Sequence, residues 1–223
     1  DNDRTIQHRW KAAHYHETYT RAYETRVEQQ EHLICLKSHV ALLAPTVQRI
    51  LDMQIEWQID EAGGIAVHFT AQKDPDFLEL PRFGVRLCLD HALEQVVYSG
   101  MGPQESYRDK HRGSSHGRYE STVTAMHEDY IFPQENGSHY HCAFVKVGEL
   151  KAEGTKPISF NASYYTAQEL TEKMHNYELE KSGHVIWHLD YGMSGVGSNS
   201  CGPELLKQYR LNEEKMHWEL VIG

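Results

Sequence analysis

The sequence lacks the features that define several common protein classes. Its four cysteines are scattered and form no CxxC pair, which argues against a zinc ribbon or a thiol redox motif. No apolar run approaches the roughly 20 residues that span a bilayer, and no signal peptide is visible. An even number of cysteines permits disulfides, but a chain this long does not need them. We therefore favour free thiols in a reducing, cytoplasmic compartment.

Basic residues are also few. Lysine and arginine number 22 against 32 acidic residues, so the net charge is −10. Such a surface repels phosphate backbones, and no Lys/Arg stripe with interleaved aromatic residues occurs, which excludes nucleic acid as an expected partner. The 39% hydrophobic share and four tryptophans are sufficient for a folded core.

Familiar catalytic motifs are missing as well. The chain has no GxSxG elbow, and no order of Ser, His and Asp picks out a triad. Gly195-Val196-Gly197 lacks the third glycine and the lysine of a phosphate-binding loop, so we expect its glycines to allow a sharp turn or a close approach to a ligand. Glu213-Glu214 lies in a polar stretch and is predicted to be a solvated turn. We assign no catalytic residue in this chain.

What the sequence does contain is an alternation of apolar and polar residues with period two, typical of strands with one buried face. Ile55, Trp57 and Ile59 alternate with polar residues, and the pattern resumes at Ile65 after a Gly-containing turn. This predicts a β-hairpin. Further strands are predicted at 85–89, 144–147, 185–189 and 218–222, and within 19–43.

One helix is indicated near 167–177. Thr166 and Glu169 have the spacing of a capping box, in which the threonine caps an amide and the glutamate reaches back. Leu170, Met174 and Tyr177 follow at helical spacing and predict one apolar stripe packed on a sheet. A further helical turn is weakly indicated within 4–16.

Two long irregular stretches, 100–120 and 191–203, separate these elements. Loops of this length without structure of their own tend to be functional or disordered. No linker or internal repeat divides the chain, so we predict a single β-sandwich domain over 1–223. Because the sequence begins at Asp1 rather than a methionine, we expect a fragment of a longer protein, with the N-terminal edge of the domain missing.

His139 and His141 have the spacing of neighbours on one face of a strand. Such a pair could hold a metal ion, but a closed zinc site needs four ligands, and no third is close in sequence. Exposed strand histidines are the favoured interpretation, and we predict no metal site.

Several stretches resemble the C-terminal domain, also called the small chain, of glycoside hydrolase family 2 β-galactosidases. They follow the family order across nearly the whole chain. The matching segments are 1–3 with Trp10, 80–87 (LPRFGVRL), 100–109 (GMGPQESYRD), 133–137 (PQENG), 160–163 (FNAS), Glu169-Leu170, 190–193 (DYGM) and 195–203 (GVGSNSCGP).

The resemblance implies a mainly β fold, an antiparallel supersandwich like that of galactose mutarotase. It also implies that the parent protein hydrolyses terminal β-D-galactosides, such as lactose, with retention. Retaining hydrolysis needs two carboxyl groups about 5 Å apart. In the family both belong to a (β/α)₈ barrel domain, together with the magnesium and sodium ligands. We therefore expect no cofactor in this chain, and the catalytic barrel as its partner.

One family role falls within this chain. The loop before the last strands reaches the active-site mouth, and its tip helps to form the subsite for the leaving or acceptor sugar. Some members have tryptophan at the tip and others cysteine; here the position is Cys201. A thiol offers a sugar ring less surface than an indole. Ser198, Asn199 and Ser200 are its candidate neighbours in substrate binding. Glu105, Tyr107, Glu135 and Asn136 match family positions too, and we expect them to hold long loops in place.

Three alternatives remain open at this point. The chain could be a stand-alone carbohydrate-binding module, a mutarotase-like protein, or the small subunit of a heteromeric β-galactosidase. A homo-oligomer is also possible, and no membrane partner is expected.

Overall fold

The computed structural model describes residues 6–46, 48–196 and 204–223. The chain forms two compact units: unit 1 is built from Pro81–Leu211, and unit 2 from Arg4–Leu80 together with Asn212–Gly223. The chain thus leaves unit 2 after Leu80 and returns to it for the last strand. This division does not test the predicted single domain, which stays a prediction.

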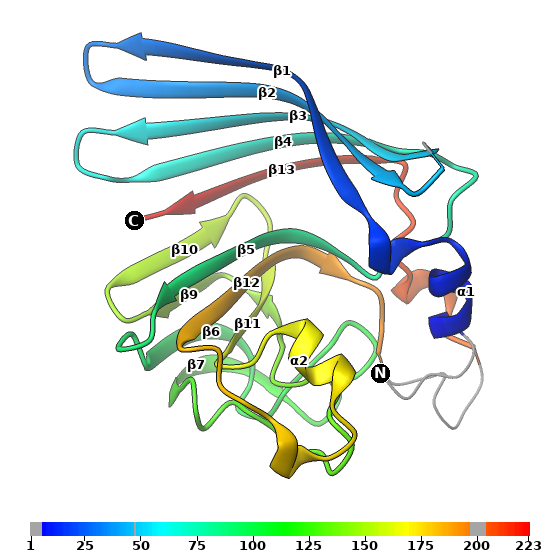
Figure 1. Ribbon diagram of the computed structural model, residues 1–223. Coiled ribbons are helices and arrows are strands. Elements are labelled where there is room, and N and C mark those ends of the chain that lie inside the picture. The colour runs from blue at the N-terminus through cyan, green and yellow to red at the C-terminus, as the bar shows by residue number, and fades with distance from the viewer. Residues whose placement is uncertain (1–5, 47, 197–203) are drawn as a thin grey trace. The chain divides into compact units, whose positions relative to one another are not determined.

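Unit 2 contains five neighbouring antiparallel strands of a nine-stranded sheet, in the order β1-β2-β3-β4-β13. Its strands lie side by side in Figure 1. Their bounds are β1 Tyr19–Gln30, β2 Leu33–Ala44, β3 Gln48–Asp60, β4 Ile65–Lys73 and β13 Lys215–Ile222. The predicted hairpin is confirmed as β3 and β4, with the Gly63 φ of 87° supplying the turn. The strands predicted within 19–43 and at 218–222 are confirmed too.

Helix α1 (Ile6–Ala12) and the 3₁₀ turn η1 (Tyr15–Glu17) confirm the helical turn predicted within 4–16. Two side chains of this helical region donate hydrogen bonds to the chain just before Leu80, where it leaves unit 2. The indole N–H of Trp10 donates to the Glu79 carbonyl at 3.0 Å, and the Tyr15 hydroxyl donates to the Leu78 carbonyl at 2.8 Å. Lys73 is buried at the end of β4, where its ammonium donates to the carbonyls of Asp74 and Phe77.

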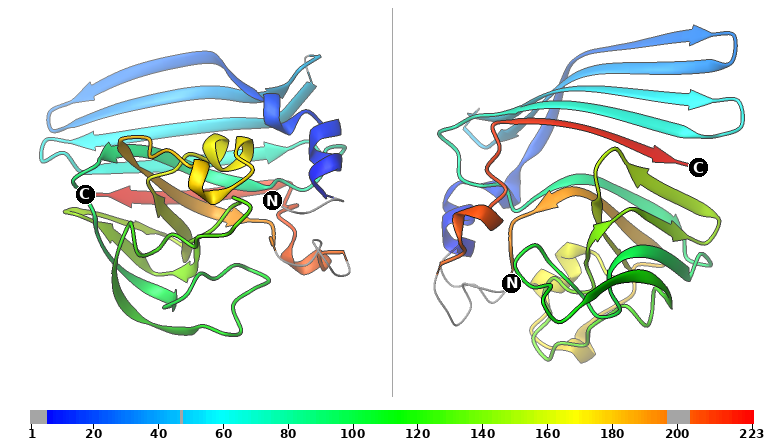
Figure 2. Two further views of the ribbon diagram at one scale, coloured as in Figure 1. Left: turned by 60° about the horizontal axis from the view of Figure 1, so that its bottom comes forward. Right: turned by 180° about the vertical axis from the view of Figure 1, so that it is seen from behind.

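Unit 1 contains two four-stranded antiparallel arrays, ordered β10-β9-β6-β7 and β5-β12-β11-β8. Figure 2 shows these strands from two further sides. Their bounds are β5 Arg82–Asp90, β6 Gln95–Gly102, β7 Ser115–Thr122, β8 His139–Cys142, β9 Phe144–Val147, β10 Leu150–Gly154, β11 Ile158–Ser163 and β12 His184–Met193. The strands predicted at 85–89, 144–147 and 185–189 are confirmed.

The two arrays of unit 1 pack through an aromatic cluster. Tyr98 of β6 lies with its ring centroid 4.4 Å from that of His139 (β8) and 5.2 Å from that of Phe160 (β11). All three side chains are buried. Since Tyr98 belongs to one array and the other two to its partner, unit 1 is a β-sandwich, and the antiparallel β fold expected from the sequence is confirmed.

Helix α2 (Ala167–Glu172) begins as predicted but ends early. The Thr166 hydroxyl accepts from the Glu169 amide at 3.0 Å, whereas the Glu169 carboxylate accepts from the Glu180 amide at 2.8 Å. The helix stops at Glu172, and Met174 and Tyr177 are 60% and 79% exposed. The predicted apolar stripe is therefore wrong beyond Leu170, because Lys173 adopts an extended conformation and Tyr177 lies in the separate turn η2 (Asn176–Glu178).

The long irregular stretches are shorter than the sequence suggested. β6 extends to Gly102 and β7 begins at Ser115, so only 103–114 connects them. Likewise β12 continues to Met193. Within the described residues, no helix is long and apolar enough to span a bilayer.

Candidate functional site

The residues predicted to contact sugar, Ser198, Asn199, Ser200 and Cys201, lie outside the described residues. The structure describes the segments on either side of them. The first runs from β12 to Val196, and the second is Glu204–Leu211, which contains the turn η3 (Lys207–Tyr209). We call these flanking segments and the side chains that hold them the loop base. All of them belong to unit 1.

The two flanking segments are hydrogen-bonded to each other. The Gly195 amide donates to the Tyr209 carbonyl at 3.2 Å, and the Leu211 amide donates to the Ser194 hydroxyl at 2.9 Å. The Ser194 amide in turn donates to the Pro81 carbonyl at 3.0 Å, just before β5. The described chain on the two sides of 197–203 is therefore joined directly by hydrogen bonds.

Asp109 lies directly against the end of the first flanking segment. Its Oδ1 accepts from the Val196 amide at 3.2 Å. A Cβ placed on Gly195 would lie 2.4 Å from the Asp109 Cγ and 2.6 Å from Leu205 Cδ1, closer than real carbon contacts. Gly195 therefore packs closely against Asp109 and Leu205. A close approach to a ligand stays a prediction, and Gly197 lies outside the described residues.

Arginine side chains hold the second flanking segment. Arg210 donates from Nε to the Leu205 carbonyl at 3.0 Å and pairs with Glu204 at 3.1 Å. Arg108, next to Asp109, donates to the Arg210 carbonyl at 3.5 Å. The segment 108–109 thus contacts the chain on both sides of 197–203.

A buried ion pair fixes the strand that leads into the loop. Arg82 contacts both carboxylate oxygens of Asp190, each at 3.0 Å, and reaches Glu135 at 3.4 Å. Burial raises the pKa of Asp190 to about 6, while Arg82 opposes that shift by attracting the carboxylate. Burial disfavours the charged form of Arg82 too, but Asp190 and Glu135 outweigh it and raise the Arg82 pKa. Both groups are charged at neutral pH. The Arg82 Nη2 group donates a hydrogen bond to Asp190 Oδ2, whereas the Nε–Oδ1 approach is an ion-pair contact without hydrogen-bond geometry.

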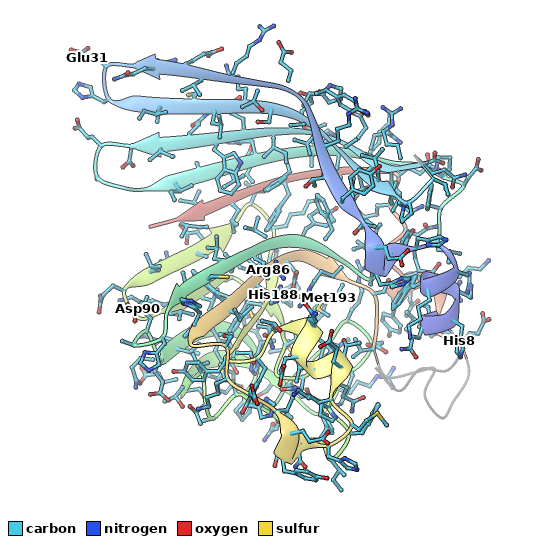
Figure 3. All side chains as sticks on the ribbon, in the orientation of Figure 1. His8, Glu31, Arg86, Asp90, His188 and Met193 are labelled. Atoms are coloured by element: carbon cyan, nitrogen blue, oxygen red, sulfur yellow. The ribbon has the colours of Figure 1, made fainter. Side chains whose placement is uncertain are left out.

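His188 lies on the same strand and stays neutral. Burial lowers its pKa to about 2, assisted by the positive charges of Arg82 and Arg86. Figure 3 labels Arg86 and His188 beside each other on β5 and β12, where the two residues are direct partners in the ladder. This imidazole is therefore neutral at neutral pH.

Glu105 joins two long connections of unit 1. One carboxylate oxygen accepts from Lys110 at 2.6 Å and from the Tyr130 hydroxyl at 2.5 Å. The other accepts from the Gly137 amide at 3.0 Å and the Tyr107 hydroxyl at 3.2 Å. Burial would raise the pKa of Glu105, but these hydrogen bonds outweigh it and lower the pKa.

Asn136 completes this framework. Its side chain accepts from the Glu128 amide at 3.1 Å and donates to the Gln134 carbonyl at 2.9 Å, and its own carbonyl accepts from Asn161 at 2.5 Å. The expectation that Glu105, Tyr107, Glu135 and Asn136 hold loops in place is confirmed. The carboxylates near the loop base accept from amides, hydroxyls or cations, an arrangement suited to positioning a loop.

The interpretation of the two strand histidines needs correction. His139 is buried against Tyr98 and Phe160, and burial lowers its pKa to about 4, whereas His141 is exposed with a φ of 56°. The left-handed residue breaks the alternation, so the pair does not share one face and only His141 is exposed. In the part of the chain that is described, no group of three or more His, Cys, Asp or Glu side chains could hold a metal ion.

The polar pair Glu213-Glu214 and three of the four cysteines lie among the described residues. Glu213 and Glu214 are exposed before β13, as predicted. Cys35, Cys88 and Cys142 are free thiols, as favoured, and Cys201 lies outside the described residues. Arg82, Asp109 and Asp190 belong to segments that carry the family resemblance, but sequence reasoning gave them no role because their partners are distant in sequence.

The model of the family described as "Beta galactosidase small chain" matches residues 1–222. The chain belongs to this family. It is 44% identical to a beta-galactosidase of Actinobacillus pleuropneumoniae over its whole length, and 34% identical to one of Staphylococcus xylosus. These alignments cover 22% and 23% of the relatives, so the chain spans about a fifth of their length.

A more distant relative is the beta-galactosidase of Kluyveromyces lactis, 33% identical over 67% of this chain and 14% of the relative. Among solved structures, galactose 1-epimerase from Lactobacillus acidophilus NCFM is similar with a TM-score of 0.48 and 8% identity, over 89% of this chain and 65% of that one.

Proposed function

We propose that this chain is the small-chain part of a retaining β-galactosidase of glycoside hydrolase family 2, acting on terminal β-D-galactosides such as lactose. The observation that carries the proposal is the family match over residues 1–222, together with a share of about a fifth of each full-length relative. The two catalytic carboxyl groups, and the magnesium and sodium sites, are then supplied by the catalytic barrel that forms the rest of the enzyme.

The specific contribution of this chain is the segment 198–201, offered to the active-site mouth. The loop base supports this role, because amides and side chains of unit 1 hold the described chain on both sides of 197–203. A sugar subsite needs supporting contacts around it, and these flanking segments supply them. Cys201 is the residue that faces the leaving or acceptor sugar, with Ser198, Asn199 and Ser200 beside it.

An assay with a chromogenic β-galactoside tests where the chemistry lies. The purified 223-residue chain should give no turnover above background, whereas the full-length enzyme hydrolyses the substrate. Turnover by the chain that persists through successive purification steps would refute the proposal that the acids lie elsewhere.

Replacement of Cys201 by tryptophan in the full enzyme tests the role of the loop. An indole stacks on a sugar ring, so Cys201→Trp should strengthen inhibition by glucose and raise the yield of transfer to acceptor sugars. A matched control is Cys88→Trp, since Cys88 is an exposed thiol on β5. Identical glucose inhibition in Cys201→Trp and the native enzyme would remove Cys201 from the subsite.

The family's description as a small chain also supports a second arrangement, in which a separately encoded catalytic chain pairs with this one. Co-expression of this chain with a catalytic chain distinguishes the two. Activity that appears only on mixing two polypeptides indicates a heteromeric enzyme, and activity in one long polypeptide indicates a single chain.

A further inference from the structure

One face of the five sheet strands in unit 2 is apolar from β1 to β13. Direct cross-strand partners point to the same face of an antiparallel sheet. One such row runs through Val27, Leu36, Trp57, Val67 and Leu220, on β1, β2, β3, β4 and β13 in turn.

The next row along the sheet has the same character. It runs through Ile34, Ile59, Ile65 and Ile222 on the four strands from β2 to β13. On the other side of the first row, the Phe69 ring stacks on Trp218 at 5.5 Å and meets Trp57 edge-on at 6.5 Å. The apolar rows and the aromatic ladder therefore form one continuous surface, which we call the apolar face.

The exposure of the apolar face changes steadily along the sheet. Val67 and Leu220 are completely buried, Trp57 and Leu36 are half-buried, and Val27 at the edge is 67% exposed. Ile34 and Ile59 in the next row are also exposed, at 44% and 38%. Exposed apolar patches that continue a buried core in this way mark interaction sites.

The opposite face of the same strands has the composition of a solvated surface. The row beside the apolar one reads Arg26, Lys37, Glu56, His68 and Glu219. Its side chains form exposed ion pairs with their neighbours, such as Lys37 with Glu28 at 2.8 Å. The contrast between the faces shows that the exposed valine and isoleucines are not a general feature of this sheet.

The exposed edge strand of the sheet also indicates an interaction site. β1 is the terminal strand in the sheet order, and all twelve of its residues are exposed. A long exposed edge strand is a template for pairing with further polypeptide, and soluble proteins usually cover or shorten such edges.

We propose that the exposed end of the apolar face, Val27, Ile34, Leu36, Trp57 and Ile59, is covered by polypeptide of the same β-galactosidase that lies outside these 223 residues. This rests on the proposed function, since it requires the chain to act within a larger enzyme. The chain spans 22% of the Actinobacillus pleuropneumoniae relative, which leaves ample polypeptide to cover the face. A second copy of this chain is disfavoured as the occupant because each copy carries a net charge of −10.

Radical footprinting of the full-length enzyme, read by mass spectrometry, tests this surface. Trp57 and Val27 should be modified at least several-fold more slowly than in the 223-residue chain, while Tyr23, exposed beside His39, is modified equally in both. Equal modification of Trp57 in the two would overturn the proposal. Protection of Trp57 that disappears when the enzyme is diluted, or that is already complete in the chain alone, would assign the cover to another copy or to the chain itself and would also overturn it.

A pair of charge substitutions on one strand gives an independent test. Val27→Glu and Gln30→Glu add the same charge to β1, the first on the apolar face and the second on the other face. In the full-length enzyme, Val27→Glu should lower the urea midpoint and restore modification of Trp57, and Gln30→Glu should do neither. Equal effects of the two variants would contradict a covered apolar face.

Galactosidase activity of the full-length enzyme is measured in the same samples and separates the two proposals. An active enzyme with a freely modified Trp57 refutes the proposed cover of the apolar face but leaves the proposed function unaffected. An inactive enzyme with a protected Trp57 refutes the function but not the cover.

Discussion

The loop base of unit 1 is held by polar contacts, whereas one face of the sheet in unit 2 is apolar. On both sides of residues 197–203, hydrogen bonds and ion pairs hold the described chain, as between Arg82 and the Asp190 carboxylate and between the Val196 amide and Asp109. In unit 2, the apolar face continues past the buried core to an exposed edge at Val27. A segment held by directional bonds has one position, whereas an apolar surface accepts a cover of matching shape. The first arrangement suits a site that must be placed accurately, and the second suits an interface.

The largest expected effect comes from breaking the buried ion pair. Arg82→Ala leaves the Asp190 carboxylate buried without its cation, and should cost about 3–5 kcal/mol of unfolding free energy. Urea denaturation of the chain measures it. Arg118→Ala is the control, because Arg118 is exposed and its ion pair with Glu120 is long, at 3.9 Å, so the loss should be under about 1 kcal/mol. Similar losses for both arginines would refute the special role of the buried pair.

Gly195→Ala tests the close approach at the loop base. The new methyl group meets Asp109 and Leu205 at less than 3 Å, and overpacking of this kind costs about 1–3 kcal/mol. In the full enzyme the same variant should change glucose inhibition, because the loop must shift. Gly113→Ala provides the comparison, since its Cβ meets nothing within 4 Å. A neutral result at Gly195 would mean that the loop base tolerates displacement.

Within unit 2, two valines in one cross-strand row measure the gradient of burial. Val67→Ala should destabilise the chain by about 1.5–2 kcal/mol, because Val67 is fully buried and loses two methyl groups' worth of packing. Val27→Ala, the same change at the exposed end, should shift the urea midpoint of the chain by less than a third as much. Equal losses would show that Val27 is covered within the chain.

The smallest expected effect is a pH dependence from Glu105. Its pKa is lowered in the folded chain, so its contribution to stability is complete above the ordinary value of 4.5 and is lost as the pH falls through the lower, folded value. Unfolding free energies should be measured from about pH 3 to about pH 7, a range that includes the titration of Glu105. With falling pH they should decrease less steeply in Glu105→Gln than in the native chain. Glu120→Gln, on an exposed residue of β7, should leave the native slope unchanged. A native slope in Glu105→Gln would contradict the shift.

Local sequence signals predicted the strands well and the loop base poorly, for physical reasons. The alternation at Ile55, Trp57 and Ile59 reports one-sided burial, which is a local property of a strand, and β3 and β4 follow it. The cap at Thr166 was also found correctly, but helical spacing alone could not reveal that the chain turns at Lys173 and exposes Tyr177.

The contacts of the loop base join residues too distant for any local pattern to indicate. Asp109 and Val196 are separated by 87 positions, and Arg82 and Asp190 by 108. The buried position of His139 was missed for a related reason: the left-handed residue His141 interrupts the strand alternation on which the prediction relied. The resemblance to β-galactosidases covered the segments that carry these residues, but the pairing of those segments emerged only from the fold.

We propose that Cys201, which lies in sequence between the two segments of the loop base, faces sugar in an enzyme whose catalytic acids lie outside this chain. The alkylation rates of Cys201 and Cys88 in the full-length enzyme, with and without saturating glucose, test it most directly. The account predicts that glucose slows alkylation of Cys201 several-fold and leaves the exposed Cys88 unchanged. Alkylation of Cys201 at the same rate with and without glucose would contradict it.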